Sequence, residues 1–190
     1  MDNRVEEILD FWFGVGIERG SPRKAWFSKD KEFDDSIRTR FLATYEEAAA
    51  GKLAGWQERG VECLALVVLL DQFPRNMFRN SGRAFAADEL AIEAARYAIT
   101  RGFDRVMRPV ERQFLYLPFE HSETLQDQML SCELMSQLKV FPETADVHRW
   151  AVKHLEIIQR FGRFPHRNAS LGRASSPDEE EFLKQPGAGF

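Results

Sequence analysis

Apolar positions along this chain recur mostly every three or four residues, which is the spacing of a helix with one buried face. Residues 33–49 follow this spacing, and Ser28 suits the N-cap position ahead of them. Residues 61–72 are apolar on most sides, so we expect a central helix there, and Pro74 is expected to end it because proline lacks the backbone N–H. Alternating patterns typical of strands are scarce. The pattern therefore predicts an all-α protein.

Helix signals continue through the second half of the chain. The same spacing predicts further helices over residues 84–101, 109–117, 122–138 and 142–161. Gly102 and Gly162 suit the left-handed residue that follows a helix end, and Pro118 is expected to kink or end its helix. One more helix is expected after Ser176, which opens a Ser-Pro-Asp-Glu string with the pattern of a capping box. We therefore expect seven or eight helices, stacked as antiparallel pairs.

The composition is that of a soluble globular chain, with 44% hydrophobic and 29% charged residues. A length of 190 residues fits one domain, which we assign to residues 1–184. The tail at residues 185–190, rich in Gly and Pro, is expected to be loose. The 16 phenylalanines have no polar group, so most of them should lie in the core or around an apolar pocket.

Charge and cysteine usage disfavour several locations and ligands. A formal net charge of −4 argues against a general nucleic-acid binder, which needs a basic surface. Cys63 and Cys132 lie in apolar helical patterns and have neither zinc nor redox spacing. The longest apolar run, residues 64–70, is far shorter than the about 20 residues that span a bilayer, and the first residues contain no apolar signal segment. We therefore expect a cytoplasmic protein with no membrane partner, metal or cofactor.

Two segments of the chain resemble each other. The string Phe73-Pro74-Arg75-Asn76 is echoed by Phe164-Pro165-His166-Arg167-Asn168, and each string is followed by Gly-Arg-Ala and then by Asp-Glu. Both stretches carry arginines in acid-free surroundings, and guanidinium groups suit bidentate binding of carboxylate or phosphate. If the two segments face each other, they form one anion-binding pocket. The alternative stays open that each arginine binds only the last carbonyls of a nearby helix.

The residues expected at this pocket are mostly charged. The candidate ligand-binding residues are Asp71, Arg75, Asn76, Arg83, Arg112, Arg163, His166, Arg167 and Asn168. Asp71 is a carboxylate within an apolar pattern and needs a partner, for which we expect Arg112 or an arginine of the opposite segment. Glu120 and His121 follow Pro118 and are the candidate catalytic residues, as an acid/base pair. An ordinary solvated pair is the alternative reading of these two residues.

Three longer strings resemble a known family. They are Leu69-Leu70-Asp71-Gln72-Phe73-Pro74-Arg75-Asn76, then Arg112-Gln113-Phe114-Leu115-Tyr116-Leu117-Pro118-Phe119-Glu120-His121-Ser122, and Arg163-Phe164-Pro165-His166-Arg167-Asn168. They resemble the uncharacterised, mainly bacterial family known as domain of unknown function 924, and the likeness extends from Ile8 to Arg173. The resemblance implies a tetratricopeptide-like all-α fold of stacked helix pairs. It carries no catalytic residue over, because the family has no established activity.

Two classes of function fit these residues. In the first, the arginines and asparagines of the echoing segments hold a small anionic ligand in a helical groove, and Asp71, Glu120 or His121 reads or deprotonates its other end. In the second, the same arginines clamp the carboxylate terminus of a peptide or partner protein. A closed cavity would favour the first class, and an open groove the second. RNA binding is disfavoured by the net charge and by the acidic run at residues 178–181.

Overall fold

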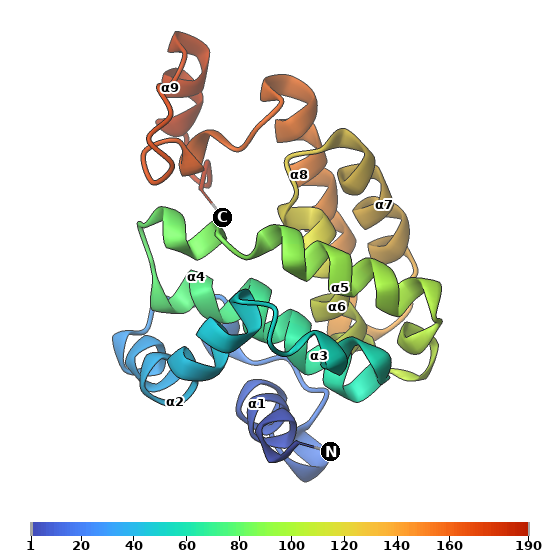
Figure 1. Cartoon of the computed structure of the whole chain (residues 1–190). Helices are drawn as coiled ribbons and strands as arrows, with labels where there is room; N and C mark the ends of the chain where they lie inside the picture. The colour runs from blue at the N-terminus through green and yellow to red at the C-terminus, as the bar shows by residue number, and fades with distance from the viewer. Residues whose placement is uncertain (1, 190) are drawn as a thin grey trace.

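A computed structural model describes residues 2–189, and among these residues the regular elements are all helices, with no strand, so the predicted all-α fold is confirmed (Figure 1). The helices are α1 Asn3–Phe13, α2 Lys31–Ala49, α3 Gly60–Val67, α4 Phe73–Met77, α5 Asp88–Thr100, α6 Pro109–His121, α7 Leu125–Ser136, α8 Val147–Phe161 and α9 Pro177–Leu183. Since α3 and α4 are joined without a break, the described residues form eight helices, within the seven or eight expected.

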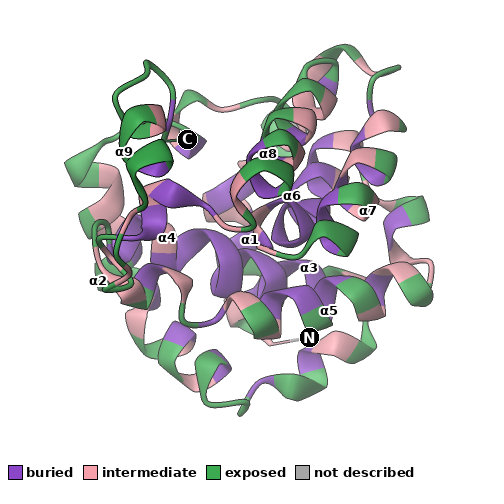
Figure 2. Ribbon diagram, turned by 90° about the horizontal axis from the view of Figure 1, so that it is seen from above, coloured by how far each residue is buried: buried purple, intermediate pink, exposed green. Residues whose placement is uncertain are grey.

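The core lies between α3 and the helices around it. Figure 2 shows buried residues gathered over α3 and α6, as the apolar character of residues 61–72 predicts. Aromatic side chains join three helices there: the Trp12 ring of α1 lies 5.6 Å from the ring of Phe73 and 5.4 Å from that of Phe114. Both of these phenylalanines are fully buried. Much of the phenylalanine content therefore fills the core.

The prediction that Pro74 ends its helix is wrong. Residues Val68–Gln72 form a π-turn, in which the N–H of Phe73 donates to the carbonyl of Val68, five residues earlier. This wider turn places Pro74 in the first turn of α4, where a missing N–H costs little. The backbone therefore continues through proline to Met77, and the echoed Phe-Pro-Arg-Asn string is helical.

Pro118 also lies within a helix. Of the two expected outcomes, an end of the helix at Pro118 is wrong, because α6 runs through it to His121, and a kink stays a prediction. Glu120 and His121 therefore belong to the last turn of α6 and do not begin a loop. The packing of α6 against its neighbours, with Pro118 itself buried, outweighs the local cost of one missing hydrogen bond.

Helix ends follow the sequence where a single residue determines them. Gly102 and Gly162 both have φ of 70°, and Ser176 forms the predicted capping box with Glu179. The starts predicted for three other helices differ from the structure. Asp30, and not Ser28, caps α2, and short 3-10 turns precede the regular helix at α5 and at α8. The same apolar spacing fits a 3-10 turn, which has about three residues per turn and is tighter than an α-helix.

The Gly162→Ala variant is expected to lower the free energy of unfolding by about 1 kcal/mol. Gly162 has a φ of +70°, and an added Cβ would meet no atom within 4 Å, so the cost comes from the backbone alone. Gly55→Ala is the matched control, because Gly55 also has open space around it and no positive φ. Urea unfolding followed by circular dichroism compares the two. Equal effects in the two variants would contradict the backbone explanation.

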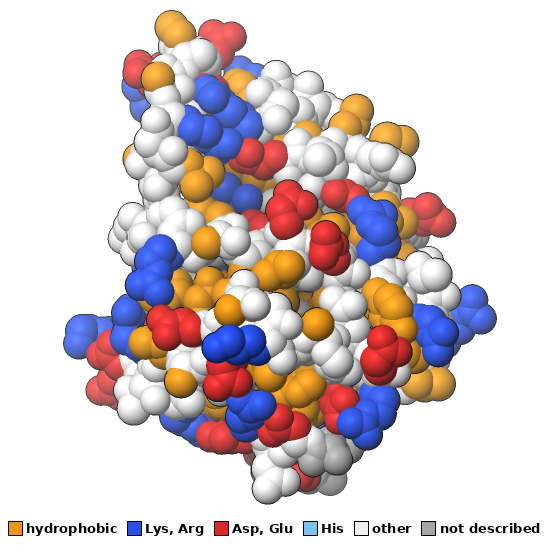
Figure 3. Space-filling model, viewed as in Figure 1, with side chains coloured by type: hydrophobic (Ala, Val, Ile, Leu, Met, Phe, Trp, Pro, Cys, Tyr) orange, Lys and Arg blue, Asp and Glu red, His pale blue; other side chains and the backbone are white. Residues whose placement is uncertain are grey.

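The described surface carries charges of both signs. On the face in Figure 3, Lys and Arg side chains are interspersed with Asp and Glu over the lower half of the molecule. None of the helices in residues 2–189 is long and apolar enough to cross a bilayer.

Candidate ligand-binding site

The two echoing segments meet at Asp88, the first residue of α5. From α4, Arg75 donates through Nη1 and Nη2 to the two carboxylate oxygens of Asp88, at 2.9 and 3.0 Å. From the second segment, Nη1 of Arg167 lies 3.4 Å from the same carboxylate. Arg167 belongs to a 3-10 turn, Pro165–Arg167, that follows α8. One carboxylate thus joins an arginine from each copy of the echo.

Asp71 lies fully buried in the π-turn and has three partners. Its Oδ1 is 2.8 Å from Nδ1 of His121 and 3.3 Å from Nη1 of Arg75, while Nε2 of Gln72 donates to its Oδ2 at 2.6 Å. Burial by itself raises the pKa of Asp71, but the positive charge of Arg75 and the bond to His121 outweigh it and lower the pKa. Asp71 is therefore an ionised carboxylate. Both expected partners are wrong: Arg112 binds Tyr116 and Gln137, Arg167 of the opposite segment contacts Asp88, and the guanidinium beside Asp71 is that of Arg75 from its own segment.

His121 is held by this carboxylate. Because an ionised Asp71 accepts, Nδ1 of His121 carries the proton, and Nε2 has the lone pair. Within residues 2–189 no hydrogen bond is made through Nε2, and 15% of the side chain is exposed. Burial and the charge of Arg75 lower the pKa of His121. A neutral imidazole with one oriented, uncommitted nitrogen is suited to accept a proton.

Glu120, which precedes His121 in the chain, lies in a different environment. Its Oε1 lies 3.2 Å from Nδ1 of His154 on α8, and Nδ1 of that ring also lies 2.9 Å from the carbonyl of Trp150. Burial, with a contribution from Asp71, raises the pKa of Glu120 to about 8. Burial likewise lowers the pKa of His154 to about 3. Glu120 and His154 are therefore both neutral at pH 7, with the proton on the carboxyl group.

Arg167 is an almost fully buried guanidinium. It lies over the rings of Phe85 and Phe164, 4.6 Å from each centroid. Its Nε has no hydrogen-bond partner among the described residues, and its contact with Asp88 is long. Burial and the nearby Arg75 lower the pKa of Arg167 to about 10. Buried donors are nearly always bonded, so a buried Nε without an acceptor is unusual.

These side chains form one group, which we name the central polar cluster. Its members are Asp71, Arg75, Asp88, Glu120, His121, His154 and Arg167. Two ionised carboxylates face two guanidinium groups, and the remaining members are neutral at pH 7. The net charge of the cluster is therefore zero. His166 adjoins it: its ring lies 5.6 Å from that of Phe164, and burial and Arg167 lower its pKa to about 4.

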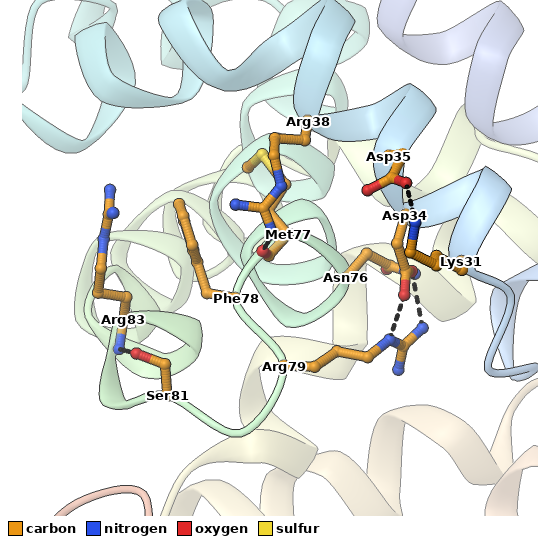
Figure 4. A pocket seen from close by; sticks show the side chains of 10 residues that line it. All are labelled: Lys31, Asp34, Asp35, Arg38, Asn76, Met77, Phe78, Arg79, Ser81 and Arg83. Atoms are coloured by element: carbon orange, nitrogen blue, oxygen red, sulfur yellow. Dashed lines mark hydrogen bonds and ion pairs between the residues drawn. The ribbon is translucent and has the colours of Figure 1, made fainter.

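Two predicted site residues line a different feature. Asn76 and Arg83 lie on an open surface hollow of about 430 Å³ between α2 and the end of α4 (Figure 4). Asn76 donates to Asp34 at 2.8 Å, as does Arg79, while Arg83 is 59% exposed and lies 3.6 Å from Glu46. None of the seven cluster residues lines this hollow. The structure therefore does not bring Asn76 and Arg83 into the cluster.

The remaining predicted residues have local partners. Arg112 donates to the Tyr116 hydroxyl and to Gln137. Arg163 binds Glu179 at 2.6 and 2.7 Å and so supports the start of α9. Asn168 donates to Ser175 and accepts from Arg173, which itself binds Glu123.

The acid-free stretches therefore do have counter-ions, and these come from elsewhere in the chain. Asp34 neutralises Arg79, Glu123 neutralises Arg173, and Glu179 neutralises Arg163. Acid-free surroundings in the sequence therefore do not mean that an arginine has no counter-ion, because each of these three binds a carboxylate outside its own stretch. Among the described arginines, Arg167 is the one with a buried side-chain nitrogen that has no partner.

Three contributors to the cluster were missed. Asp88 begins the Asp-Glu pair that recurs in both copies of the echo, so the sequence held a signal for it. His154 lies within the helical spacing of residues 142–161, and nothing in the sequence links it to Glu120. The described residues contain no group of three or more His, Cys, Asp or Glu that could hold a metal ion. Phe85, which packs against both arginines, has no signal beyond its place in a helical stretch.

Comparison with known proteins gives a family and a related structure. Residues 8–187 match the model of a family described as bacterial protein of unknown function (DUF924). A solved structure, that of the protein of unknown function ATU0120 from Agrobacterium tumefaciens, is similar at a TM-score of 0.85 and 38% identity, covering 97% of this chain and 98% of that one. No curated protein matches the chain.

Proposed function

The chain belongs to the bacterial DUF924 family, and since that family has no assigned activity, we propose from the central polar cluster that the protein binds a small anion, a carboxylate or a phosphate, at Arg167. The observation that carries the proposal is the buried Nε of Arg167, which has no acceptor among the described residues. Leaving a buried charged donor unsatisfied costs several times what a typical hydrogen bond contributes. A bound anion removes that cost and adds a charge-assisted bond.

Acid–base chemistry on the bound anion forms the second part of the proposal. Asp71 and Glu120 are two carboxyl groups of one cluster whose pKa values are shifted in opposite directions, below and above the usual value. Such divergence is how one site holds a base system and an acid at the same pH. We assign His121, oriented by Asp71, as the general base, and Glu120 as the general acid. The reaction class is proton transfer to and from an anionic substrate.

Anion binding is tested by a thermal-shift screen with sodium salts of carboxylates and phosphates, followed by calorimetry on the compounds that stabilise the protein. In Arg167→Ala, the affinity is expected to fall about 10- to 100-fold, corresponding to the loss of a charged hydrogen bond of about 1.5–3 kcal/mol. Arg83→Ala is the matched control, because Arg83 belongs to the same echo pattern and lies outside the cluster.

Arg167→Lys keeps the charge if the alanine variant fails to fold. Lysine has no planar fork and cannot replace the Nε donor, so this variant is expected to bind at least 10-fold more weakly than the wild type. Compounds that bind the wild type and both Arg167 variants equally well would overturn the proposal.

A further inference from the structure

We infer that the anion held at Arg167 is a small monocarboxylate with an apolar body, and not a phosphate. This inference rests on the proposed anion site and names the class of its ligand. Three features of the cluster carry it: its charge, its uncommitted donors and the rings around Arg167.

Charge is the first feature. Asp71 and Asp88 already balance Arg75 and Arg167, so the ionised groups of the cluster sum to zero. A monocarboxylate adds one negative charge to this buried region, whereas phosphate at pH 7 adds between one and two. The second charge would lie close to Asp88, which shares Arg167 with the ligand. Repulsion between like charges is strong where water is excluded, so the cluster favours the monoanion.

Uncommitted donors are the second feature. Nε of Arg167 is one, and Oε2 of Glu120 is the other buried cluster atom without a partner in residues 2–189. Because burial keeps Glu120 protonated near neutral pH, its carboxyl group has a hydrogen to donate. Two buried donors of the cluster are thus without an acceptor, one charged and one neutral, and the carboxylate oxygens of a ligand at Arg167 accept from the charged one.

The rings around Arg167 are the third feature. Phe85 and Phe164 pack against its guanidinium, and Phe164 is fully buried. Of the two rings, that of Phe85 is only partly buried, so the atoms of a ligand next to its carboxylate would meet this ring. An apolar body gains from this contact, whereas the hydroxyl oxygens of a phosphate would lose their hydration there. The site consequently suits compounds such as benzoate better than acetate, and both better than phosphate.

Isothermal titration calorimetry at pH 7 and constant ionic strength tests this inference with three probes: benzoate, acetate and inorganic phosphate. We expect benzoate to bind at least 10-fold more tightly than phosphate, with acetate between them. The benzoate affinity should fall at least 10-fold in Arg167→Lys and stay unchanged in Arg83→Ala.

Two failures are distinguishable. If phosphate binds as tightly as benzoate and its binding is lost in Arg167→Lys, the inference of a monocarboxylate is overturned. The proposed anion site is then still supported. If no probe binds the wild type at about 10 mM, or if binding is the same in Arg167→Lys, both inferences are overturned. A further arm uses an acetylated tetrapeptide with a free C-terminal carboxylate. If it binds at least 10-fold more tightly than benzoate, the small-molecule assignment is overturned in favour of a peptide terminus.

Discussion

Replacing Asp71 by asparagine is expected to lower the free energy of unfolding by about 3 kcal/mol, because it removes one partner from a buried network of charges. The amide keeps the shape of the side chain but not its charge, so Arg75 retains only Asp88 as a counter-ion, and His121 loses the carboxylate that orients its ring. Urea unfolding at pH 7, followed by circular dichroism, measures the loss. A decrease below about 1 kcal/mol would contradict the view that Asp71 organises the cluster.

Asp35→Asn is the control for this experiment. Asp35 pairs with Lys31 across one helical turn and is 57% exposed, so its removal should change the free energy of unfolding by less than about 0.5 kcal/mol. A second readout separates orientation from stability. The bond from Asp71 raises the pKa of His121, so the pKa measured by NMR titration of the ring should fall in Asp71→Asn and stay unchanged in Asp35→Asn.

Glu120→Gln is expected to stabilise the protein by about 4 kcal/mol at pH 7.5 and by less than about 1 kcal/mol at pH 5. In the folded chain the pKa of Glu120 is raised to about 8 from a usual value of 4.5. The stability that its protonated form provides is complete below pH 4.5 and is lost as pH rises through 8, since the unfolded chain gains by ionising. Glutamine does not ionise, so the benefit of the substitution grows over that interval.

Thermal unfolding of the wild type and the variant at pH 5, 6, 7 and 7.5 gives this profile directly. Glu46→Gln is the control, because Glu46 is 60% exposed and should leave the dependence of stability on pH as it is in the wild type. Parallel profiles for the wild type and Glu120→Gln would show that Glu120 is ionised in the folded protein. That result would also remove the general acid from the proposed chemistry.

The helices were predictable from the sequence because their signals are local. A left-handed glycine such as Gly102 or a capping box such as the one at Ser176 acts within one turn, and the apolar spacing of α2 needs no knowledge of the rest of the fold. Pro74 misled for the same reason, because the π-turn that accommodates it does not follow from the local preference of proline. At Pro118, α6 continues because packing against neighbouring helices outweighs the local cost. The stacking of the helix pairs as a tetratricopeptide-like superhelix stays a prediction.

Only some residues of the central polar cluster could be predicted from the sequence. The repeated Phe-Pro-Arg/Asn string identified Arg75 and Arg167, because a repeat is visible in a linear chain. Which arginines are neutralised was not visible, since their carboxylates lie far away in sequence: Arg79 meets Asp34, and Arg173 meets Glu123. Which carboxylate neutralises which arginine is decided by how the folded chain packs. That packing leaves Arg167, alone among the arginines of residues 2–189, with a buried nitrogen that has no acceptor is therefore a structural finding.

The π-turn at Val68–Gln72 also affects how related chains should be aligned. A regular helix rotates by about 100° per residue, so the extra residue that widens this turn puts α4 out of phase with α3 by that angle. The apolar pattern of α3 therefore cannot be extended in register as far as Met77. Two homologues that differ by a one-residue gap in this segment would share the fold, but the side chains after the gap would point in a different direction. The length of this segment, and not only its residue identities, is thus a criterion for deciding which relatives carry the same cluster.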